Sequence, residues 1–409
     1  MAISEGNMIS VEQALAILHD NIPEPTQKNI PLEQAYNCRV CEDIYAPESS
    51  PRYTNSAMDG FAVRWMDCQH ASQAAPITLE IIGESQAGAP FSGQLTDGTA
   101  VRISTGAMLP DGADSIVRVE DTRENSNSVD ILSIRAFGQD VRLQGEEFHQ
   151  GELLFSKSTC LRARELALMA SMGLHRVNVF MPPGVSLLIT GTELARFDDQ
   201  DIAPHQIRDS NAIMLESAVK DSGAVLRGSA LVEDSLPNTI QAIAEAAKLD
   251  NAVILCSGGV SVGRHDHVKE AAKEVGFKEL FWKIRQKPGK PLFVGRKEDI
   301  LLFGLPGNPV SAYMCFRNYV RPVLAELQGT QSLNHSITAK ATEKINNSGS
   351  RTNFIRVVVD NKPNEIARIT EVAQQGSHML SSIVRADGYI VLKPGEILEP
   401  CGLTEVFLF

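Results

Sequence analysis

The second half of the chain alternates short apolar runs with amphipathic stretches of helical length. The apolar runs, which predict buried strands, lie at 185–190, 224–232, 252–256, 279–284 and 300–304. The amphipathic stretches, which predict helices, lie at 210–222, 235–249, 264–275 and 308–327. Strands that alternate with helices are typical of a parallel sheet covered by helices on both faces. The pattern therefore predicts an α/β domain.

The rest of the chain has a different pattern. An amphipathic helix is expected over 8–20. A stretch at 55–138 is rich in Gly, Thr and short β-type runs. It is flanked by connecting segments of framework character, one of which contains a predicted helix at 162–173. From residue 330 onward the chain again consists of strand-like runs. We therefore expect a β-rich inserted module and a small C-terminal β-barrel or sandwich beside the α/β domain.

Composition narrows the class of protein. A chain of 409 residues has room for two to four domains, and its formal net charge of −12 argues against nucleic-acid binding, which needs a basic face. No apolar segment reaches the length of a membrane span, and the N-terminal twenty residues lack the basic region of a signal peptide. Cys38 and Cys41 form a C-x-x-C without a second pair, so we expect ordinary thiols. These features predict a cytoplasmic enzyme with neither nucleic-acid nor membrane partners.

The segment 252–263 is the most informative part of the chain. An apolar strand candidate runs into a turn of small residues, and a helix candidate follows. Glycines let backbone N–H groups approach a ligand, and a helix N-terminus adds partial positive charge, so this arrangement holds anions. A tight strand-to-helix turn without a ligand is the simpler alternative. The candidate substrate-binding residues here are Ser257, Gly258, Gly259, Ser261 and Gly263.

Two more turns follow strand candidates further along. RQKPGKP at 285–291 places Lys287 and Lys290 around a Pro-Gly turn, shortly after Lys283. An apolar run then leads into the third turn, whose candidate residues are Pro306, Gly307, Asn308 and Pro309. Taken singly, these are a solvated basic turn and a plain helix start. Because ligands of parallel sheets bind outside the carboxyl ends of the strands, we expect the three turns to serve one site.

The three turns, together with motifs upstream, resemble the MoeA family of molybdopterin molybdenumtransferases, which includes the E domain of gephyrin. The upstream motifs are NSAMDGFAV at 55–63, RISTGAMLPDGAD at 102–114, LLITGTEL at 187–194 and IRDSN at 207–211. The resemblance covers nearly the whole chain in family order. It implies an α/β and β multidomain fold with a parallel-sheet, MogA-like molybdopterin-binding domain, an inserted β-rich domain, an extended framework domain and a C-terminal β-barrel. The implied boundaries are 1–28 (N-terminal helix), 29–52 with 139–178 (framework and dimerisation), 53–138 (insertion), 179–328 (α/β) and 329–409 (barrel).

MoeA-like proteins insert molybdate into the dithiolene of adenylylated molybdopterin and release AMP, and the resemblance implies the same here. Carboxylates beside anions need a cation between them, and hard oxygen ligands with retained waters suit Mg²⁺. The resemblance thus implies catalytic acids that also bind the metal, namely Asp59, Glu193, Asp234 and Asp266. The other implied catalytic residues are Thr105, Lys283 and Lys287, and the other implied substrate-binding residues are Lys290, Ser377 and Glu147, where the family usually has Asp. Each acid alone also suits a turn or a helix cap.

The resemblance also implies partners. In the family, the cleft lies between the α/β domain of one chain and the β-rich insertion of its partner, so we expect a homodimer with a shared active site. An adenylylated substrate implies hand-off from a molybdopterin adenylyltransferase. Two other functions stay open. The α/β domain alone resembles that adenylyltransferase, which ATP consumption would reveal, and a scaffold or partner-binding role of the gephyrin E type would use a partner groove instead of catalysis.

Overall fold

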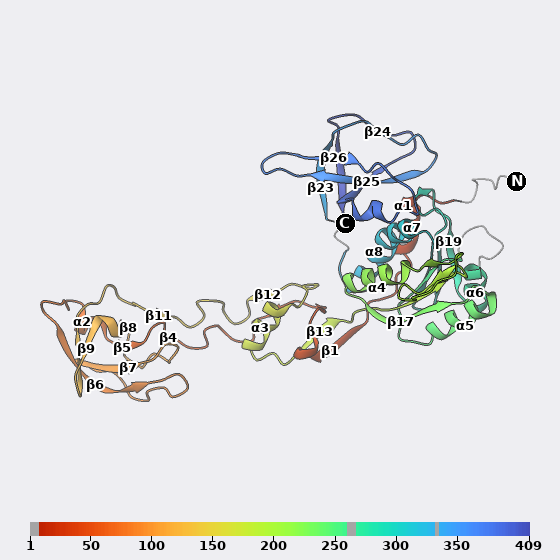
Figure 1. Cartoon of the computed structure of the whole chain (residues 1–409). Coiled ribbons are helices and arrows are strands. Elements are labelled where there is room, and N and C mark those ends of the chain that lie inside the picture. Colours follow the sequence, from red (N-terminus) through yellow and green to blue (C-terminus); the bar gives the residue numbers. More distant parts are fainter. Residues whose placement is uncertain (1–7, 260–266, 332–334) are drawn as a thin grey trace. The chain divides into compact units, whose positions relative to one another are not determined.

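The computed structural model describes residues 8–259, 267–331 and 335–409, which form two compact units (Figure 1). Unit 1 contains the described residues through Cys41, Cys160–Arg162 and Arg176–Phe409. Unit 2 contains Glu42–Thr159 and Ala163–His175. Within the described residues, no helix combines the length and the apolar character that a membrane crossing requires. The five domain boundaries drawn from the sequence stay predictions.

A six-stranded sheet forms the centre of unit 1, in the order β17-β14-β18-β22-β21-β19. Its strands are β14 (Gly184–Thr190), β17 (Val225–Val232), β18 (Val253–Ser257), β19 (Lys278–Trp282), β21 (Phe293–Lys297) and β22 (Ile300–Leu305). The first four in sheet order are parallel, as predicted. Strand β21 pairs antiparallel with both β22 and β19, so the sheet is mixed where the pattern predicted a parallel sheet. Two reversals leave β19 parallel to β22, and its carboxyl end lies at the same edge.

The inner strands β14 and β18 are buried on both faces because their alternate side chains enter two different cores. Leu187 and Leu255 join the core formed with α1, α4, α7 and α8, whereas Leu188 and Ile254 join the core formed with α5 and α6. The helices are α1 (Val11–His19), α4 (Asn211–Asp221), α5 (Leu236–Ala246), α6 (His267–Val275), α7 (Pro309–Cys315) and α8 (Arg321–Glu326). A π-helical turn at Phe316–Val320 separates α7 from α8, where the sequence predicted one continuous helix.

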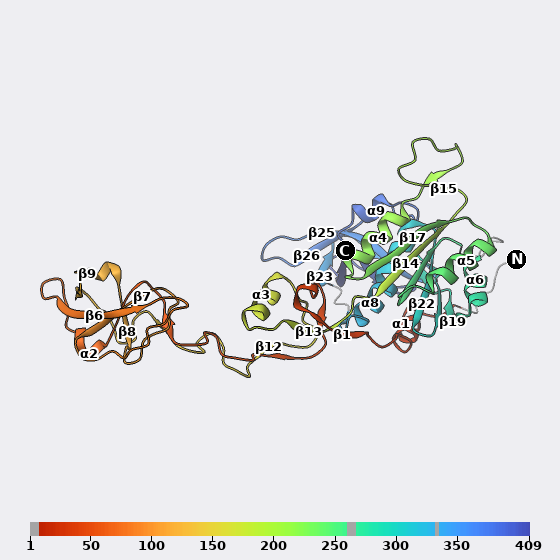
Figure 2. The same cartoon turned by 90° about the horizontal axis from the view of Figure 1, so that it is seen from below.

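Three smaller pairings complete the α/β part of unit 1. Strand β13 (Arg176–Phe180) lies between β1 (Gln27–Pro31) and β2 (Arg39–Val40). Strands β15 (Leu194–Ala195) and β16 (Ile207–Arg208) form a parallel pair within the connection between β14 and α4. Figure 2 shows this excursion projecting from the rest of unit 1.

The C-terminal part of unit 1 is a closed barrel. Its strands are β23 (Ser336–Ala341), β25 (Thr352–Asp360), β26 (Ala367–Glu371), β27 (Gly388–Leu392) and β29 (Leu403–Leu408), with β20 (Gln286–Lys287) added to β25. The short elements β24 (Ile345–Asn346), β28 (Ile397–Leu398) and α9 (Ser381–Val384) accompany it. Strand β27 pairs with both β25 and β29, which closes the ring. Phe354 and Tyr389 pack against Val310 and Met314 of α7, so the barrel is attached to the helix that follows the third predicted turn.

Unit 2 is built around a second six-stranded sheet, in the order β8-β5-β7-β6-β10-β9. Its strands are β5 (Gly60–Val63), β6 (Ile77–Ser85), β7 (Thr99–Ile103), β8 (Ser115–Arg118), β9 (Thr122–Glu124) and β10 (Ser128–Ile131). The remaining helices and strands of unit 2 are β3 (Ile44–Tyr45), β4 (Asn55–Ser56), α2 (Trp65–Cys68), β11 (Val141–Arg142), β12 (Leu153–Phe155) and α3 (Ala163–Ser171). Short 3-10 turns lie at Leu32–Gln34 in unit 1 and at Val119–Asp121 in unit 2. The β-rich character predicted for this part of the chain is confirmed.

Strand β18 is central in the α/β sheet, so its side chains should dominate the stability of that part. We expect Leu255→Ala, which removes a fully buried side chain, to lower the free energy of unfolding by about 3 kcal/mol, as large-to-small core changes do. Leu231→Ala on the outer strand β17, where the side chain is half exposed, should cost well under half as much. Urea unfolding followed by circular dichroism checks this, and equal losses in the two variants would contradict it.

Candidate active site

A cavity of about 580 Å³ lies at the carboxyl edge of the α/β sheet in unit 1. Strands β14, β18 and β22 all end there, and the loops after them supply its walls. The sequence-predicted residues that line it are Glu193, Asp234, Ser257, Gly258, Gly259, Pro306, Gly307, Asn308 and Pro309. Ser261, Gly263 and Asp266 lie outside the described residues. The parallel sheet thus brings the first and third predicted turns together with two of the predicted acids.

Backbone segments approach one another closely in this cavity. Gly258 has a φ of +94°, and a Cβ atom there would lie 2.2 Å from the carbonyl oxygen of Thr190. The Gly258 N–H donates to the carbonyl oxygen of Leu305 at 3.2 Å. A glycine is therefore required because the ends of β14, β18 and β22 meet at this point, and a side chain would force them apart.

Asn211, to which the sequence gave no role, ties the loops together. Its Nδ2 donates to Ser257 Oγ at 2.9 Å and to the carbonyl oxygen of Gly307 at 2.8 Å. Asp209 accepts the Asn211 backbone N–H at 2.8 Å, which fixes the start of α4. Asn211 Oδ1 is buried without a hydrogen-bond partner among the described residues, so it is available to a donor group of a ligand in the cavity. Its place in the IRDSN motif was the available signal.

The predicted acids of unit 1 fit a hydrated cation. Glu193 and Asp234 line the same cavity, and Asp234 Oδ1 is buried with no hydrogen-bond partner in the described part of the chain. The described residues contain no group of three His, Cys, Asp or Glu side chains placed to hold a metal. Mg²⁺ is commonly held by one or two carboxylates, with water and substrate phosphate completing its shell, so these residues fit that ion.

The lysines of the second turn do not line this cavity among its described residues, although Pro291, next to Lys290, does. Strand β20 carries Lys287 and pairs with β25, with Lys287 opposite Asn353. Burial raises the pKa of the nearby Glu371, to which Glu343 adds, whereas the charges of Lys287 and Arg356 act in the opposite direction. The second turn therefore joins the α/β part to the barrel, where a further cation lies.

That further cation is Arg356 of β25, which the sequence analysis missed. Its side chain is fully buried, and none of its three guanidinium nitrogens has a hydrogen-bond partner among the residues described. Burial lowers its pKa, although an arginine stays charged at neutral pH. A buried guanidinium without a partner is costly unless an anion reaches it. The signal was an arginine on the same face as the buried Phe354, within the run 354–359 whose other residues are all apolar.

A chain of hydrogen bonds leads from Arg356 back to the third turn. Gln375 accepts the Arg356 backbone N–H at 3.2 Å and donates to its carbonyl oxygen at 2.9 Å, which holds the following loop beside β25. In that loop, Ser377 Oγ accepts a bond from Asn308 Nδ2 at 3.2 Å, and the Ser377 carbonyl oxygen accepts the Val310 N–H at 3.2 Å. His378, which had no predicted role, lines the cavity.

The other predicted residues belong to unit 2. Strands β5 and β7 pair antiparallel with Gly60 opposite Ile103, so the residues just before one strand and just after the other lie at the same end. Asp59 accordingly accepts the Thr105 backbone N–H at 2.7 Å and its hydroxyl at 3.0 Å, and these two bonds lower the pKa of the exposed carboxyl group. Glu147 accepts the Ser50 hydroxyl at 2.7 Å.

Comparisons with known proteins agree along the chain. Family models match at residues 9–173 (MoeA N-terminal region, domain I and II), 186–326 (probable molybdopterin binding domain) and 338–400 (MoeA C-terminal region, domain IV). A Haemophilus influenzae protein named molybdopterin molybdenumtransferase is 34% identical over 392 residues, which cover 94% of this chain and 95% of that protein. This chain belongs to the MoeA family.

Other members of the MoeA family are similar over comparable lengths. A Bacillus subtilis protein with the same name is 34% identical over 375 residues, which cover 90% of this chain and 86% of that protein. The crystal structure of the molybdopterin biosynthesis MoeA protein from Pyrococcus horikoshii matches with a TM-score of 0.82 at 28% identity, covering 98% of this chain and 99% of that one. The multidomain α/β and β fold inferred from the sequence is confirmed.

The two bonds from Thr105 should be measurable in the titration of Asp59. We expect its carboxyl to titrate below the usual aspartate range and to rise partway toward that range in Thr105→Val, which loses the hydroxyl but keeps the stronger backbone N–H contribution. Thr105→Ser should stay close to the parent. Because the pKa is lowered on folding, the stabilisation is present above the ordinary value and disappears as pH falls through the lowered one. Carbon NMR of the carboxyl checks this, and identical values in all three proteins would contradict it.

Proposed function

We propose that this chain inserts molybdenum from molybdate into adenylylated molybdopterin and releases AMP. The observation that carries the proposal is the cavity at the carboxyl edge of the sheet, where the first and third turns, Glu193 and Asp234 meet in a domain matched by a molybdopterin-binding model. The curated relatives named molybdopterin molybdenumtransferase support the same reaction. The two dithiolene sulfurs bind molybdenum while an oxo oxygen of molybdate leaves as water with the two thiol protons. A water molecule cleaves the phosphoanhydride bond, so that AMP leaves and the phosphate stays on the pterin.

The cavity would hold the phosphate-bearing end of the substrate. The backbone around Gly258, Gly259 and Gly307 is open enough for a phosphate to approach, and Asn211 keeps these loops in register. Glu193 and Asp234 would hold Mg²⁺, which when bound offsets phosphate charge and polarises its oxygens. The predicted Asp266, which is outside the described residues, would be a further ligand.

The oxyanion would bind where the second turn meets the barrel. Molybdate is a dianion, so it needs cations and hydroxyl or N–H donors in a site that excludes water. Lys283, Lys287 and Lys290 supply charge on the turn, and the unpartnered guanidinium of Arg356 supplies donors from the buried side. Ser377, tied to Asn308, would connect this site to the phosphate cavity. The position of the cations at one end of the substrate would orient molybdate toward the dithiolene.

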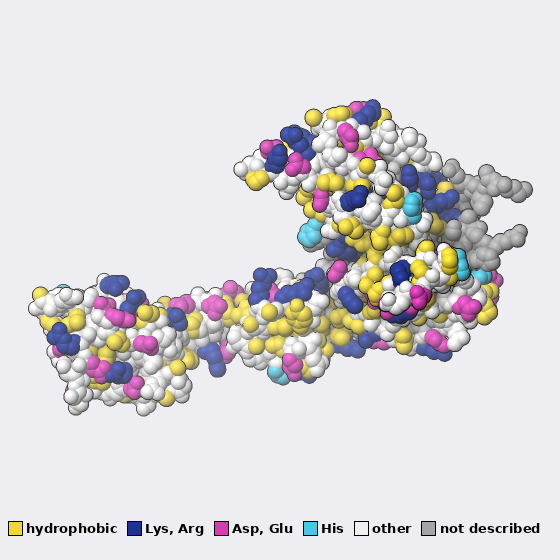
Figure 3. All heavy atoms as spheres, in the orientation of Figure 1, with side chains coloured by type: hydrophobic (Ala, Val, Ile, Leu, Met, Phe, Trp, Pro, Cys, Tyr) yellow, Lys and Arg dark blue, Asp and Glu magenta, His cyan; other side chains and the backbone are white. Residues whose placement is uncertain are grey.

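A homodimer would complete the site. Figure 3 shows hydrophobic side chains gathered on the surface around α3, which is in unit 2. Tyr45 and Leu153 are opposite one another across β3 and β12, and they are 54% and 47% exposed. Exposed apolar pairs on a framework segment suit an interface between copies of this chain. Asp59, Thr105 and Glu147 of one protomer would then reach the α/β cavity of its partner.

The remaining partners follow from the substrate. An adenylylated pterin that is sensitive to water and oxidation must be received from a molybdopterin adenylyltransferase, and we place this hand-off in the cytoplasm. The formal net charge of −12 argues against a nucleic-acid partner.

The direct test is turnover of adenylylated molybdopterin with molybdate and Mg²⁺, followed as AMP release and cofactor formation. We expect Asp234→Ala to lower the rate by more than about 10²-fold, the loss typical of a positioned charge. Glu233→Ala removes the neighbouring carboxylate, which bonds Asn238 at 2.9 Å and does not line the cavity, and it should stay within about threefold. Full activity in excess EDTA would contradict the proposed Mg²⁺ site. Absence of AMP release by the parent protein would contradict the proposed molybdenum insertion.

Lys287 should act through its charge on molybdate. We expect Lys287→Gln to raise the molybdate concentration needed for half-maximal rate by about tenfold or more, with partial rescue at high molybdate. The difference from the parent should become smaller at high salt, because salt screens the charge that the parent uses. Lys287→Arg should restore molybdate binding more fully than the rate of insertion, because the planar guanidinium group of arginine does not replace the compact ammonium group of lysine. Lys248→Gln, an exposed lysine after α5, is the matched control. A normal molybdate dependence in Lys287→Gln would make the second turn a plain surface turn.

A shared site has a specific signature in mixed dimers. Asp59→Ala and Asp234→Ala chains should each be inactive alone. After unfolding and refolding together, half of the dimers are mixed and one of their two sites is intact, so activity should return to about a quarter of the parent. Mixed chains that stay inactive although they form dimers would contradict a site shared between protomers.

A further inference from the structure

Two lysines rest against one tryptophan at the carboxyl edge of the α/β sheet. Trp282 is the last residue of β19, and the Nζ atom of Lys283 lies 3.7 Å from the centroid of its ring. The Nζ atom of Lys269, in the first turn of α6, lies 4.2 Å from the same centroid. The indole face carries negative potential and attracts ammonium groups. Trp282 therefore lies between the helix that follows the first turn and the lysine that precedes the second.

We propose that Trp282 is a positioning residue that holds the Lys283 ammonium group in place for the oxyanion. The proposal rests on the function proposed above, in which Lys283 binds molybdate. A lysine side chain has four flexible bonds and a strongly hydrated head, so it loses much freedom when it is fixed in one place. A flat aromatic ring beside it favours a narrow set of positions for the ammonium group.

The backbone gives Lys283 a fixed starting point. Its φ is +70°, a left-handed conformation that is uncommon for a lysine. Its N–H donates to the carbonyl oxygen of Leu292 at 3.0 Å, and its own carbonyl oxygen accepts the Ile9 N–H at 3.3 Å. Such a conformation persists only where the surroundings hold it. Strand β19, the two backbone hydrogen bonds and the contact with the Trp282 indole together restrict the direction of the Lys283 side chain.

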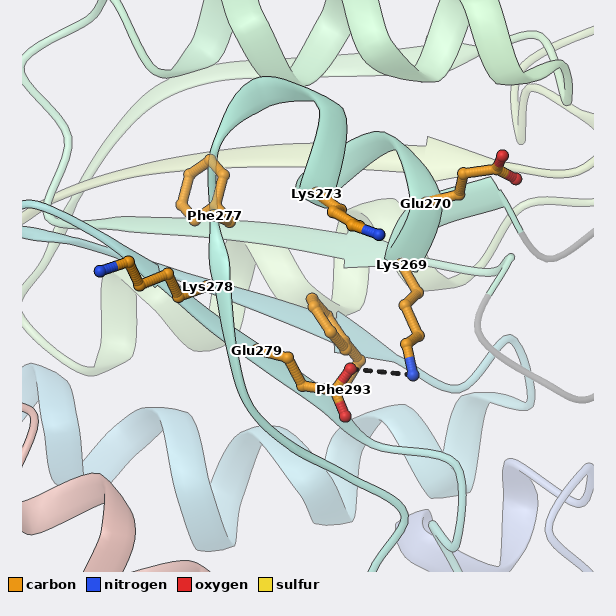
Figure 4. A pocket seen from close by; sticks show the side chains of 7 residues that line it. All are labelled: Lys269, Glu270, Lys273, Phe277, Lys278, Glu279 and Phe293. Atoms are coloured by element: carbon orange, nitrogen blue, oxygen red, sulfur yellow. Dashed lines mark ion pairs between the residues drawn. The ribbon is translucent and has the colours of Figure 1, made fainter.

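The second lysine is anchored by its own partner. Lys269 Nζ forms an ion pair with Glu279 Oε2 of β19 at 2.8 Å, and Figure 4 shows the two side chains meeting in front of the sheet. The Glu279 carboxylate offsets the charge of Lys269, which allows one indole to accommodate two ammonium groups. The ion pair also connects the first turn of α6 to β19, so a shift of either element would move the Lys269 ammonium group relative to the Trp282 ring.

A plain packing role is the alternative. Trp282 packs against the core that contains Leu188, Ile254 and Phe293, so a smaller residue there would also loosen the sheet edge. The distinction is that a packing role affects stability and rate without depending on Lys283. A positioning role predicts that replacing Trp282 has no further effect on the molybdate KM once Lys283 has been replaced.

The test is a double-mutant cycle on the full-length protein in the molybdenum-insertion assay, with the KM for molybdate measured separately from kcat. Trp282→Leu should raise the KM by about five- to tenfold with a smaller change in kcat, whereas Trp282→Phe, which keeps an aromatic face, should stay within about threefold. Lys283→Met should raise the KM at least as much as Trp282→Leu. The double variant should be no worse than Lys283→Met alone. Lys273→Met, further along α6, is the matched control and should leave the KM unchanged.

The outcomes separate the two proposals. An unchanged molybdate KM in Lys283→Met would refute the oxyanion role of Lys283 itself. A KM increase in Lys283→Met with multiplicative effects in the double variant, or a Trp282→Leu variant with normal KM, would leave that role intact and overturn the positioning role of Trp282.

Fluorescence gives a second readout that needs no turnover. The chain has two tryptophans, Trp65 and Trp282, so Trp65→Phe leaves Trp282 as a single reporter. Adding tungstate, a dianion of the same shape as molybdate, should change Trp282 emission with saturation, because an anion bound to the Lys283 ammonium group changes the electric field at the ring that this group contacts. Potassium perchlorate at equal ionic strength should not, and Lys283→Met should abolish the tungstate response. A response that survives in Lys283→Met would overturn the proposal even if Trp282→Leu proved too unstable to assay.

Discussion

The contact between Gly258 and Thr190 is the constraint on which the site depends. Parallel strands that end at the same edge can bring their loops together only where backbone meets backbone, and here there is no room for even one Cβ atom. That approach lets Asn211 bridge Ser257 and Gly307 with a single amide group. The cavity lies beside this contact and is lined by Thr190, Gly258 and Gly307.

The charge distribution of the protein follows a related logic. A chain with a formal net charge of −12 has to gather its cations locally to attract anions. It does so by setting exposed lysines on a turn and a fully buried arginine on the adjoining barrel strand. The carboxylates are placed in the neighbouring cavity, where a divalent ion can lie between them and a phosphate. One acid, Glu371, lies near Lys287 and Arg356, and burial raises the pKa of its carboxyl group.

Much of this architecture was readable from local pattern. Apolar runs such as 252–256 and their following helices were found because burial on both faces leaves a continuous apolar signature. The apolar character of β21 was visible, but its direction was not, because strand–helix alternation predicts parallel strands and β21 instead joins β22 by a tight antiparallel connection. The π-helical turn at Phe316–Val320 was invisible because its residues keep a helical pattern of burial. Arg356 was missed because a charged residue in a strand is normally read as its solvent face.

The sequence by itself determined most of the strands and the turns, because glycine, proline and apolar periodicity act over a few neighbouring positions. The roles expected of the acids came from the resemblance to the MoeA family. The sequence also placed Asp59 and Thr105 in motifs, although not in contact. Only the tertiary structure decided which of these residues meet. The pairing of β5 with β7 joins Asp59 to Thr105, and the packing of the barrel on α7 sets Ser377 beside Asn308. Such contacts join residues far apart in the chain, and they depend on strand order and register, which no local pattern contains.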